Sequence, residues 1–461
     1  MAGDLINGEI PDHWEFTTLG EICQRGGGNI QTGPFGSQLH ASDYVPVGVP
    51  SIMPTNIGEN RIVEDGIVRI TEEDANRLGQ HRLRAGDIIY SRRGDVEKRA
   101  LIREREEGWF CGTGCLKVRL GSGVVDPLFA SLFLGHPAIR EWIVRHAVGA
   151  TMPNLNTTIM SAVPFALPPL AEQKAIAAVL GALDDKIELN GRMNATLEAM
   201  ARALFQSWFV DFDPVRAKLD GRPPAALDPA TAALFPDSFQ DSELGHIPKG
   251  WEIRPLSEKI ELLSGGTPKT SEPDYWDGDI PWYSLKDAPS ESDVWVIQTE
   301  KRVTKLGIEN SAAQILSEGT TIISARGTVG KLALVGTPMA MNQSCYGVRG
   351  VKGYADYFTY FALQQATAEL QQRTHGTVFD TITRQTFETL DCIFPPATLT
   401  QAYEKTVAPL LARLRANLHQ SRTLATLRDT LLPKLLSGEL SLAAVNSSEF
   451  PDSSNQGNRG P

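Results

Sequence analysis

The sequence has little cysteine, and its few cysteines form no recognisable framework. Five occur in 461 residues: Cys23, Cys111, Cys115, Cys345 and Cys392. The chain opens without the basic-then-apolar order of a secretory signal, and an odd number of cysteines in an unsecreted chain argues against a disulfide framework. Cys111 and Cys115 form a CxxxC pair with no second Cys or His pair nearby, so the pattern favours buried thiols over a metal site.

Long apolar runs and net positive charge are also missing. No stretch approaches the roughly 18 consecutive apolar residues of a membrane-spanning helix, so we expect a cytoplasmic protein with no membrane partner. The 44 basic residues face 55 acidic ones, a net charge of -11, which excludes binding to nucleic acid by bulk attraction. DNA binding would therefore rest on local clusters of Arg and Lys, or on a partner that supplies positive surface.

Motifs for catalysis on DNA are missing as well. A base methyltransferase would need an Asn-Pro-Pro-aromatic or Asp-Pro-Pro-Tyr loop, whereas the Pro-Pro pairs here stand in Leu-Pro-Pro-Leu, Arg-Pro-Pro-Ala and Phe-Pro-Pro-Ala. Glu172-Gln173-Lys174 has the carboxylate-x-Lys half of a nuclease motif without its Pro-Asp, and we interpret it as a solvated helix face. No GxxxxGK[ST] phosphate loop occurs. We expect no catalytic residues, no metal site and no cofactor in this chain.

What the sequence does contain is an internal repeat. IPDHWE at residues 10–15 returns as IPKGWE at 247–252, and AGDIIYSRRGDV at 85–96 returns as EGTTIISARGTV at 318–329. Residues 149–169 match 376–396, each ending in Pro-Pro. Because these landmarks keep one order, with offsets that fall only from 237 to 227 residues, the chain is a tandem duplication.

Each copy has a β-rich part and a helical part. The first is rich in Gly, Pro and short β-branched runs, which are typical of a mixed β domain. From Leu170 to Phe209 and from Leu399 to Leu436 glycine nearly vanishes and apolar residues recur at helical spacing. At 1.5 Å per residue, helices of about 40 residues reach about 60 Å, more than an ordinary domain can cover. We therefore favour pairing of the two helices over two amphipathic helices that each lie on their own domain.

The expected fold is α+β: a duplicated mixed β-rich domain followed by a long helix, with the two helices packed as an antiparallel coiled coil. Alternating steps of four and three trace a seam in each helix, and Asn190 and Asn417 fall at equivalent positions of it. Opposed buried amides satisfy each other in a single register, so this pair is expected to fix the alignment. Pro409 predicts a bend or a later start of the second helix, and Gly438 a stop.

The segments between these parts complete the expected organisation. Asp213 to Gly245 is rich in proline and is interpreted as a connector, and Trp208 and Phe209 before it either pack on the second β domain or bind a partner. The expected divisions are a first β domain at 1–169, a helical spacer at 170–212, a linker at 213–246, a second β domain at 247–396, a second helical spacer at 397–440 and a disordered tail at 441–461.

Several runs resemble the specificity (S) subunit of type I restriction-modification systems. They are GPFGSQLH at 33–40, SGGTPKT at 264–270, PPLAEQKAIAAVLGALDDKI at 168–187, LFQSWFVDFDPV at 204–215 and LLPKLLSGEL at 431–440. The resemblance covers residues 10–440. It implies that each β domain is a target recognition domain reading one half of a split site in double-stranded DNA. It also implies that the helices set the gap and dock two modification (methyltransferase) subunits.

The same resemblance places catalysis in partner subunits. It implies that S-adenosylmethionine belongs to the modification subunits, and ATP and Mg to a restriction (translocase and nuclease) subunit. Two other hypotheses remain: a stand-alone DNA-binding or structural adaptor without a methyltransferase partner, and an enzyme in its own right. Copurification with a modification subunit and adenine methylation of a split site separate the first two. Activity of the chain alone with S-adenosylmethionine would revive the third.

Base and phosphate contacts call for Arg, Lys, polar side chains and backbone amides on loops and strand ends. Arg93 and Arg326 are equivalent in the repeat, which favours DNA contact over a surface ion pair, whereas for Arg92 an ion pair with Asp95 or Glu97 is an equal alternative. The candidates for DNA contact are Arg92, Arg93, Lys98, Arg99, Thr267, Lys269, Arg326 and Lys331.

Two further groups have a simpler interpretation beside the functional one. The glycine runs at 26–28 and 265–266 could approach phosphates or could be tight turns. Asn154 and Asn156, opposite Thr381 and Thr383, could read bases or could cap turns, and capping is favoured.

Overall fold

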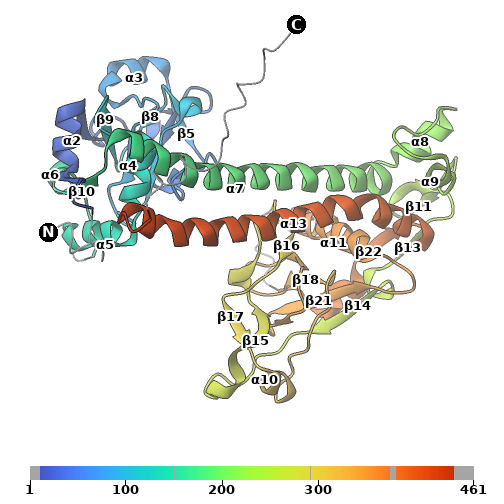
Figure 1. Ribbon diagram of the computed structural model, residues 1–461. Coiled ribbons are helices and arrows are strands. Elements are labelled where there is room, and N and C mark those ends of the chain that lie inside the picture. Colours follow the sequence, from blue (N-terminus) through green and yellow to red (C-terminus); the bar gives the residue numbers. More distant parts are fainter. Residues whose placement is uncertain (1–10, 150, 291, 374–380, 441–461) are drawn as a thin grey trace, which may run out of the picture. The chain divides into compact units, whose positions relative to one another are not determined.

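The computed structural model describes residues 11–149, 151–290, 292–373 and 381–440 (Figure 1). The chain divides into two compact units. The first ends at Asp185 and resumes at Leu424, and the second runs from Lys186 to Thr423. Each unit therefore holds one β domain together with part of both long helices. The tail expected at 441–461 lies outside the described residues.

The β domain of the first unit contains two four-stranded sheets and a two-stranded one. One sheet has the order β2-β9-β6-β7 and is antiparallel, and the other has the order β3-β5-β4-β8, with β4 and β8 parallel. β1 pairs with β10. The strands are β1 (Glu15–Thr18), β2 (Gly27–Thr32), β3 (Tyr44–Val45), β4 (Val49–Ile52), β5 (Val68–Ile70), β6 (Ile88–Ser91), β7 (Arg99–Leu101), β8 (Phe110–Cys111), β9 (Cys115–Gly121) and β10 (Pro164–Leu167).

The β domain of the second unit repeats this topology. Its larger sheet has the order β14-β21-β18-β19-β16, in which the first four strands correspond to β2, β9, β6 and β7. A second sheet, β17-β15-β20, again contains a parallel pair, and β13 pairs with β22 as β1 does with β10. The strands are β11 (Phe239–Ser242), β12 (Gly245–Pro248), β13 (Glu252–Pro255), β14 (Ile260–Ser264), β15 (Trp276–Tyr283), β16 (Trp295–Val296), β17 (Lys301–Val303), β18 (Thr321–Ser324), β19 (Leu332–Val335), β20 (Ala340–Met341), β21 (Cys345–Gly350) and β22 (Asp391–Phe394).

The helices follow the same duplication, which confirms the expected α+β tandem repeat. In each copy the β domain is followed by a long helix, α7 or α13. The α-helices are α2 (Leu19–Gly26), α3 (Glu72–Arg77), α4 (Pro127–Leu134), α5 (Pro137–His146), α6 (Thr157–Ser161), α7 (Leu170–Phe205), α8 (Asp213–Leu219), α9 (Pro229–Ala233), α10 (Lys305–Glu309), α11 (Asp356–Arg373), α12 (Arg384–Thr389) and α13 (Ala397–Leu436).

The central strands β6 and β18 show why both copies of the repeat have the same strand register. All four residues of each strand are buried, so their apolar and β-branched side chains face packed layers on both sides. Such doubly buried strands tolerate little change in register, because a slip by one residue exchanges the two faces. The turn that follows each strand therefore begins at the equivalent position of each β domain.

The long helices contact each other antiparallel within each unit. In the first unit the Arg428 guanidinium on α13 donates to the Asp184 carboxylate on α7 at 2.8 Å, and Leu180 shares a core with Leu435. In the second unit the Tyr403 hydroxyl donates to the Ala201 carbonyl at 2.8 Å. All residues of the two predicted seams are buried or half-buried. The antiparallel direction follows from these pairs, whereas coiled-coil packing stays a prediction.

Asn190 and Asn417 are buried at this helix contact, but they do not pair as two opposed amides. The Asn190 amide donates to the backbone carbonyl of Asn417 at 3.4 Å and to the Ser421 hydroxyl at 3.1 Å. The Asn417 amide donates to Asn194 at 3.0 Å, and Asn194 in turn donates to Asp293 of the β domain at 3.2 Å. The expected pair was therefore wrong in detail. In an antiparallel pair equivalent positions need not face each other, so the polar network joins non-equivalent residues.

The two expectations for the second helix, one drawn from Pro409 and one from Gly438, had different outcomes. α13 begins at Ala397, ahead of Pro409, so a later start is wrong. Burial of Val407 and Leu411 on either side holds the helical path although Pro409 lacks an N–H donor. Gly438 lies two residues after Leu436, the last helical residue, and has a φ of 76°. The Leu440 amide donates to the Lys434 carbonyl at 2.9 Å. Gly438 therefore ends the helix as expected.

The connector between the copies contains regular structure. A π-helical turn at Gln206–Val210 ends α7, and α8, α9 and the β11–β12 hairpin follow. Trp208 packs on Tyr403 and Phe209 on Trp251, with ring centroids 5.8 and 6.0 Å apart. Both aromatic residues are buried in the core of the second unit. Packing within the chain, the first of the two expected alternatives, is therefore confirmed.

The segment 172–174 is not wholly a solvated face. Gln173 is buried, and its amide group accepts from the Asp126 N–H at 2.8 Å and donates to the Pro168 carbonyl at 2.8 Å. It joins the start of α7 to α4, whereas Lys174 is exposed. The expectation was wrong for Gln173 because its partner lies 47 residues earlier in the chain.

The cysteines have free thiols, and burial raises the pKa of Cys23, Cys111 and Cys345 to about 12. Within the described ranges, no group of three or more His, Cys, Asp or Glu side chains could hold a metal ion. No helix in the same ranges is long and apolar enough to cross a membrane.

A carboxyl group at the start of α11 provides a stability prediction. Glu404 on α13 accepts from the Tyr357 N–H at 2.9 Å, and burial raises its pKa to about 7. A folded-state pKa above the unfolded value gives stability that is complete below about pH 4.5 and is lost as the pH rises through about 7. Glu404→Gln keeps an acceptor and removes the charge. We expect it to stabilise the protein by about 1 to 2 kcal/mol at pH 8, and by less at pH 5.5.

Urea unfolding of the wild-type and variant proteins at both pH values measures this difference. Glu388→Gln, which removes an exposed carboxylate on α12, serves as the control and should change stability equally little at each pH. An effect of Glu404→Gln that is the same at pH 5.5 and pH 8 would contradict the assignment.

Candidate nucleic-acid interface

In the first unit, the turn between β6 and β7 presents the first group of basic candidates. The Ser91 N–H donates to the Lys98 carbonyl at 3.0 Å and closes the turn, and Gly94 adopts a φ of 75° that favours glycine. Arg93 is exposed at its tip. The Ser91 hydroxyl donates to the Arg93 carbonyl at 2.9 Å and fixes the backbone below this side chain.

In the second unit, the turn between β18 and β19 has the same construction. The Ser324 N–H donates to the Lys331 carbonyl at 2.9 Å, and Gly327 has a φ of 83°. Arg326 and Lys331 are both exposed. The sequence between them, Gly-Thr-Val-Gly, has no acidic residue, whereas the first turn contains Asp95 and Glu97. The second turn is therefore the more strongly positive.

Segments from elsewhere in each β domain meet these turns at equivalent positions. The Leu155 N–H donates to the Arg92 carbonyl at 2.9 Å, and the Ile382 N–H donates to the Ala325 carbonyl at the same distance. A second neighbour is the turn that leads into β9 or β21: the Arg92 N–H donates to the Gly114 carbonyl, and the Ala325 N–H donates to the Ser344 carbonyl, both at 2.8 Å. Backbone hydrogen bonds to two other segments thus fix the position of each turn.

The glycine-rich loops lie against these neighbours. Gly33 donates to the Cys115 carbonyl and Gly266 to the Met341 carbonyl, both at 2.9 Å. The Thr267 hydroxyl donates to Gln343, beside Ser344. The structure therefore brings Thr267 close to the Arg326 turn. Lys269 is exposed on the same loop and forms an ion pair with Glu272 at 2.8 Å.

Among the candidates of the first unit, Arg99 is contradicted by its burial. Its side chain donates to the Ser131 carbonyl at 2.6 Å, and only 5% of the residue is exposed. As the first residue of β7 it points into the domain, whereas Lys98, one residue earlier, is exposed and pairs with Asp95 at 2.8 Å. Lys98 lies in the turn before the strand, whereas all three residues of β7 are buried. Arg99 supports the fold and is not available to DNA.

Arg92 holds neither of the ion pairs considered for it among the described residues. Its Nε donates to the Leu155 carbonyl at 3.2 Å, and its guanidinium lies 5.6 Å from the centre of the Phe35 ring. Burial, together with the charge of Arg93, lowers the pKa of Arg92. The side chain is thus engaged within the domain, and Arg93 is the more accessible of the two arginines.

The glycine runs serve close backbone packing. A Cβ at Gly28 would lie 1.9 Å from the Arg119 carbonyl oxygen, and one at Gly265 would lie 1.9 Å from that of Asn342. Gly27 ends α2 in the left-handed conformation. Close backbone contact accounts for these glycines, and approach to a phosphate stays a prediction.

The polar residues before the following helix also have structural roles. The Asn156 side chain accepts from the Ile159 N–H at 2.8 Å and caps α6, and Thr383 occupies the equivalent capping position of α12. Asn154 exchanges backbone hydrogen bonds with Val148. Capping, the favoured alternative, is confirmed for Asn156. Thr381 is half-buried beside Ile382.

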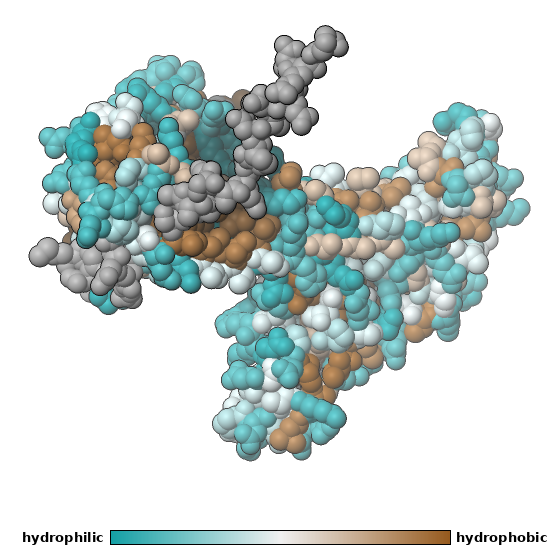
Figure 2. Space-filling view, viewed as in Figure 1, coloured by the Kyte–Doolittle hydropathy of each residue, from teal (hydrophilic) through white to brown (hydrophobic). Residues whose placement is uncertain are grey.

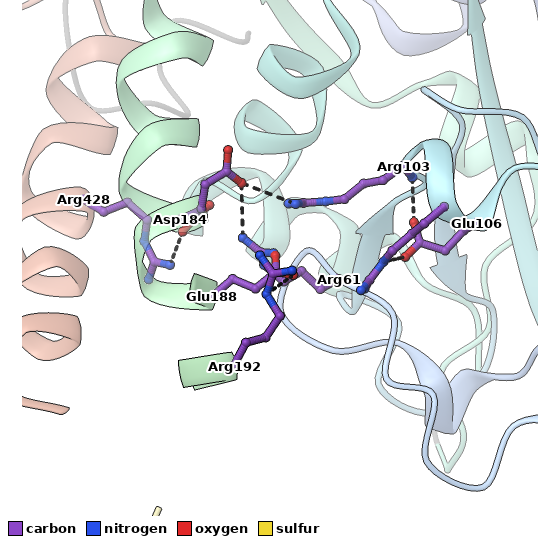
Figure 3. Close-up of polar contacts among 9 residues, drawn as sticks. Arg61, Arg103, Glu106, Asp184, Glu188, Arg192 and Arg428 are labelled. Carbon is purple, nitrogen blue, oxygen red and sulfur yellow. Dashed lines mark hydrogen bonds and ion pairs between the residues drawn. The ribbon is translucent and has the colours of Figure 1, made fainter. Parts of the chain in front are cut away.

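Different chemistry holds each β domain on the long helices of its own unit. In the first unit, Arg61 and Arg103 lie 3.7 and 3.4 Å from Asp185 on α7, and Figure 3 shows these arginines facing α7 while Arg428 reaches Asp184 from α13. In the second unit, the indole N–H of Trp295 donates to the Leu411 carbonyl on α13 at 2.9 Å. The first contact adds ion pairs to a shared apolar core that includes Ile176 and Leu180 of α7, and the second includes a buried aromatic hydrogen bond.

These observations define two diverged reading surfaces on one repeated scaffold, and comparison with known proteins identifies the scaffold. The family model for the type I restriction modification DNA specificity domain matches residues 11–199 and again residues 248–417. The chain belongs to this family. The two matched ranges are the two copies of the repeat, and each includes the β domain and a large part of the following helix.

Named relatives and a solved structure agree with this assignment. The specificity subunit of the type I restriction enzyme HindI from Haemophilus influenzae is 25% identical over 85% of this chain and 95% of that protein. The MjaIX specificity subunit from Methanocaldococcus jannaschii is also 25% identical, over 94% of this chain and 95% of that protein. A crystal structure of the S subunit of a type I restriction-modification system from M. genitalium has the same fold. Its TM-score is 0.54 at 18% identity, and the match covers 93% of this chain and 97% of that one.

The roles of three residues could not be found in the sequence. Asn194 and Asp293 join α7 to the second β domain, although they lie 99 residues apart in the chain. Phe35 is 57% exposed beside the Arg93 turn. The GPFG run drew attention to the loop, but the sequence alone could not tell whether its aromatic side chain was buried.

Proposed function

We propose that this chain is the DNA sequence-specificity subunit of a type I restriction-modification complex, and that each β domain reads one half of a bipartite DNA site. The observation that carries the proposal is the pair of equivalent turns. Both follow a fully buried strand, both contain a glycine in the left-handed conformation, and each exposes one arginine, Arg93 or Arg326. Arginine is the side chain that most often reads guanine in the major groove.

Differences around the two equivalent turns support two different half-sites. The first turn stands beside Phe35 and contains two acidic residues, whereas the second stands beside Thr267 and contains none. A protein that read the same sequence twice would gain from two identical surfaces. Unequal surfaces on equal scaffolds instead suit an asymmetric site.

The long helices are proposed to set the gap between the half-sites and to dock two modification subunits. Apolar side chains stay exposed on them: Leu189 and Met200 on α7 and Leu427 on α13 are 44%, 49% and 45% exposed. Figure 2 shows apolar residues along these helices among hydrophilic ones. Exposed apolar residues on a long helix are suited to contact with a partner protein.

Catalysis is proposed to lie in the partners. Adenine methylation with S-adenosylmethionine would belong to the modification subunits, and cleavage with ATP and Mg to restriction subunits, within a cytoplasmic complex. This chain would then supply DNA recognition and no reacting group. Its overall negative charge fits such a role, because only local basic turns are needed for contact with DNA.

Coexpression with a modification subunit tests the proposal against that of a stand-alone DNA-binding adaptor. We expect the two proteins to copurify and to transfer methyl groups from S-adenosylmethionine to adenine in host DNA, whereas neither protein does so alone. DNA binding by this chain without copurification would favour the adaptor. Methylation by this chain alone would overturn the non-catalytic role.

A further inference from the structure

We infer that Phe35 is a base-contacting residue of the first half-site, and that Arg92 is the positioning residue that holds its ring. The inference rests on the proposed function and extends it to a particular side chain. It comes from an exposed aromatic ring that the domain holds in a fixed place beside the Arg93 turn.

The loop that carries Phe35 is fixed by its own hydrogen bonds. The Phe35 N–H donates to the Gln38 side-chain oxygen at 3.1 Å, and the Gln38 N–H donates back to the Phe35 carbonyl at 2.8 Å. Leu39 anchors the end of this turn because it is 2% exposed, and Arg77 donates to the Gln38 carbonyl at 3.2 Å. The turn is therefore a rigid base for an exposed ring.

The other side of the ring is fixed by Arg92. Its guanidinium lies 5.6 Å from the ring centre, within the range of a cation–π contact. Its Nε is held in turn by the Leu155 carbonyl at 3.2 Å. Because Arg92 is tied to the domain, it supports the aromatic ring and leaves Arg93 free to approach DNA.

An exposed ring in this position lowers the stability of the free protein but can contribute to binding in a complex. More than half of Phe35 faces water, although an aromatic side chain gains greatly from burial. Since the ring is already oriented, DNA binding would order few additional torsions. Phenylalanine contacts the thymine methyl group in the major groove, or enters a base step as a wedge. In either mode the ring contacts bases, and phosphate contact is left to the arginines.

The second unit has no equivalent ring on its loop, where Thr267 and Lys269 stand at the corresponding place. The inference is thus confined to the first half-site, which makes its effect separable. Loss of the Phe35 contact should weaken discrimination in one half of the motif and leave the other half unchanged.

The test uses the complex of this chain with modification subunits and duplexes that carry its methylated motif. Phe35→Ala is expected to raise Kd for the motif duplex by about 5- to 100-fold. It should change Kd little for a duplex with the first half-site scrambled. Arg92→Ala should cause a similar loss, and Phe35→Ala with Arg92→Ala should lose little more than either alone, because both changes remove one contact.

Phe16→Ala is the matched control, since Phe16 is 51% exposed on β1, which pairs with β10 and not with β6 or β7, the strands that flank the turn. It should bind as the wild type does, and Phe35→Tyr, which keeps the ring, should retain most affinity. An unchanged Kd for Phe35→Ala would overturn the inference, as would an equal loss on both duplexes. Failure of the wild-type complex to methylate any bipartite motif would instead overturn the proposed function, and it would be seen before any variant is made.

Discussion

Replacing Arg93 by alanine is expected to raise the Kd of the assembled complex for its site by about 5- to 150-fold. Arg326→Ala should do the same. Both side chains are exposed at the tip of equivalent turns, and each would contribute base and phosphate contacts in its own half-site. If the complex methylates only when both halves are bound, as proposed, either variant should also reduce adenine methylation. Competition binding with duplexes altered in one half at a time measures the effect.

Exposed cations that form ion pairs within helices outside the turns provide matched controls. Arg145 pairs with Glu141 on α5 at 2.5 Å, and Lys305 pairs with Glu309 on α10 at 3.8 Å. Their alanine variants remove the same charge and should bind nearly as the wild type does. If Arg93→Ala and Arg145→Ala lose equal affinity, the turns have no special role and the loss reflects net charge alone.

The second large effect is expected when both long helices are lengthened. Four residues inserted after Asp185 in α7, together with four inserted before Leu424 in α13, lie at the junction of the two units. They leave the contacts within each unit in place. Four helical residues add about 6 Å. Since base pairs rise by about 3.4 Å, the gap in the methylated motif should grow by one or two base pairs.

The control places the same four residues after Leu244, in the hairpin between β11 and β12. This insertion lengthens the chain without lengthening a helix, so the gap should stay as in the wild type. A lengthened helix pair that methylates the original motif would show that the helices do not set the gap.

Much of this architecture could be predicted because it depends on local patterns. The buried strand before Arg93 returns before Arg326 with the same glycine turn, and so the repeat could be aligned from the sequence. The two seams, one with Leu180 on α7 and one with Tyr403 on α13, could be predicted because helical periodicity is contained in the sequence itself. These features need no knowledge of which distant segments meet.

Features that depend on distant partners could not be predicted. Arg99 carries the same charge as its neighbour Lys98, and only its contact with Ser131 on α4 shows that it is buried. The amide network joins Asn417 to Asn194 because of how two antiparallel helices face each other, whereas sequence equivalence had pointed to Asn190. Phe35 became a candidate only when its exposure and its contact with Arg92 were known.

Mapping of N6-methyladenine in cells tests the central claim that two domains read two half-sites. One strain carries the wild-type chain with its modification subunit, and a second carries a chain in which residues 1–165 are replaced by the equivalent domain of a relative. The wild type should methylate a motif of two short sequences separated by an unread gap. The exchanged chain should change one of those sequences and keep the other and the gap. A single continuous motif, or a change in both halves after the exchange, would contradict the account.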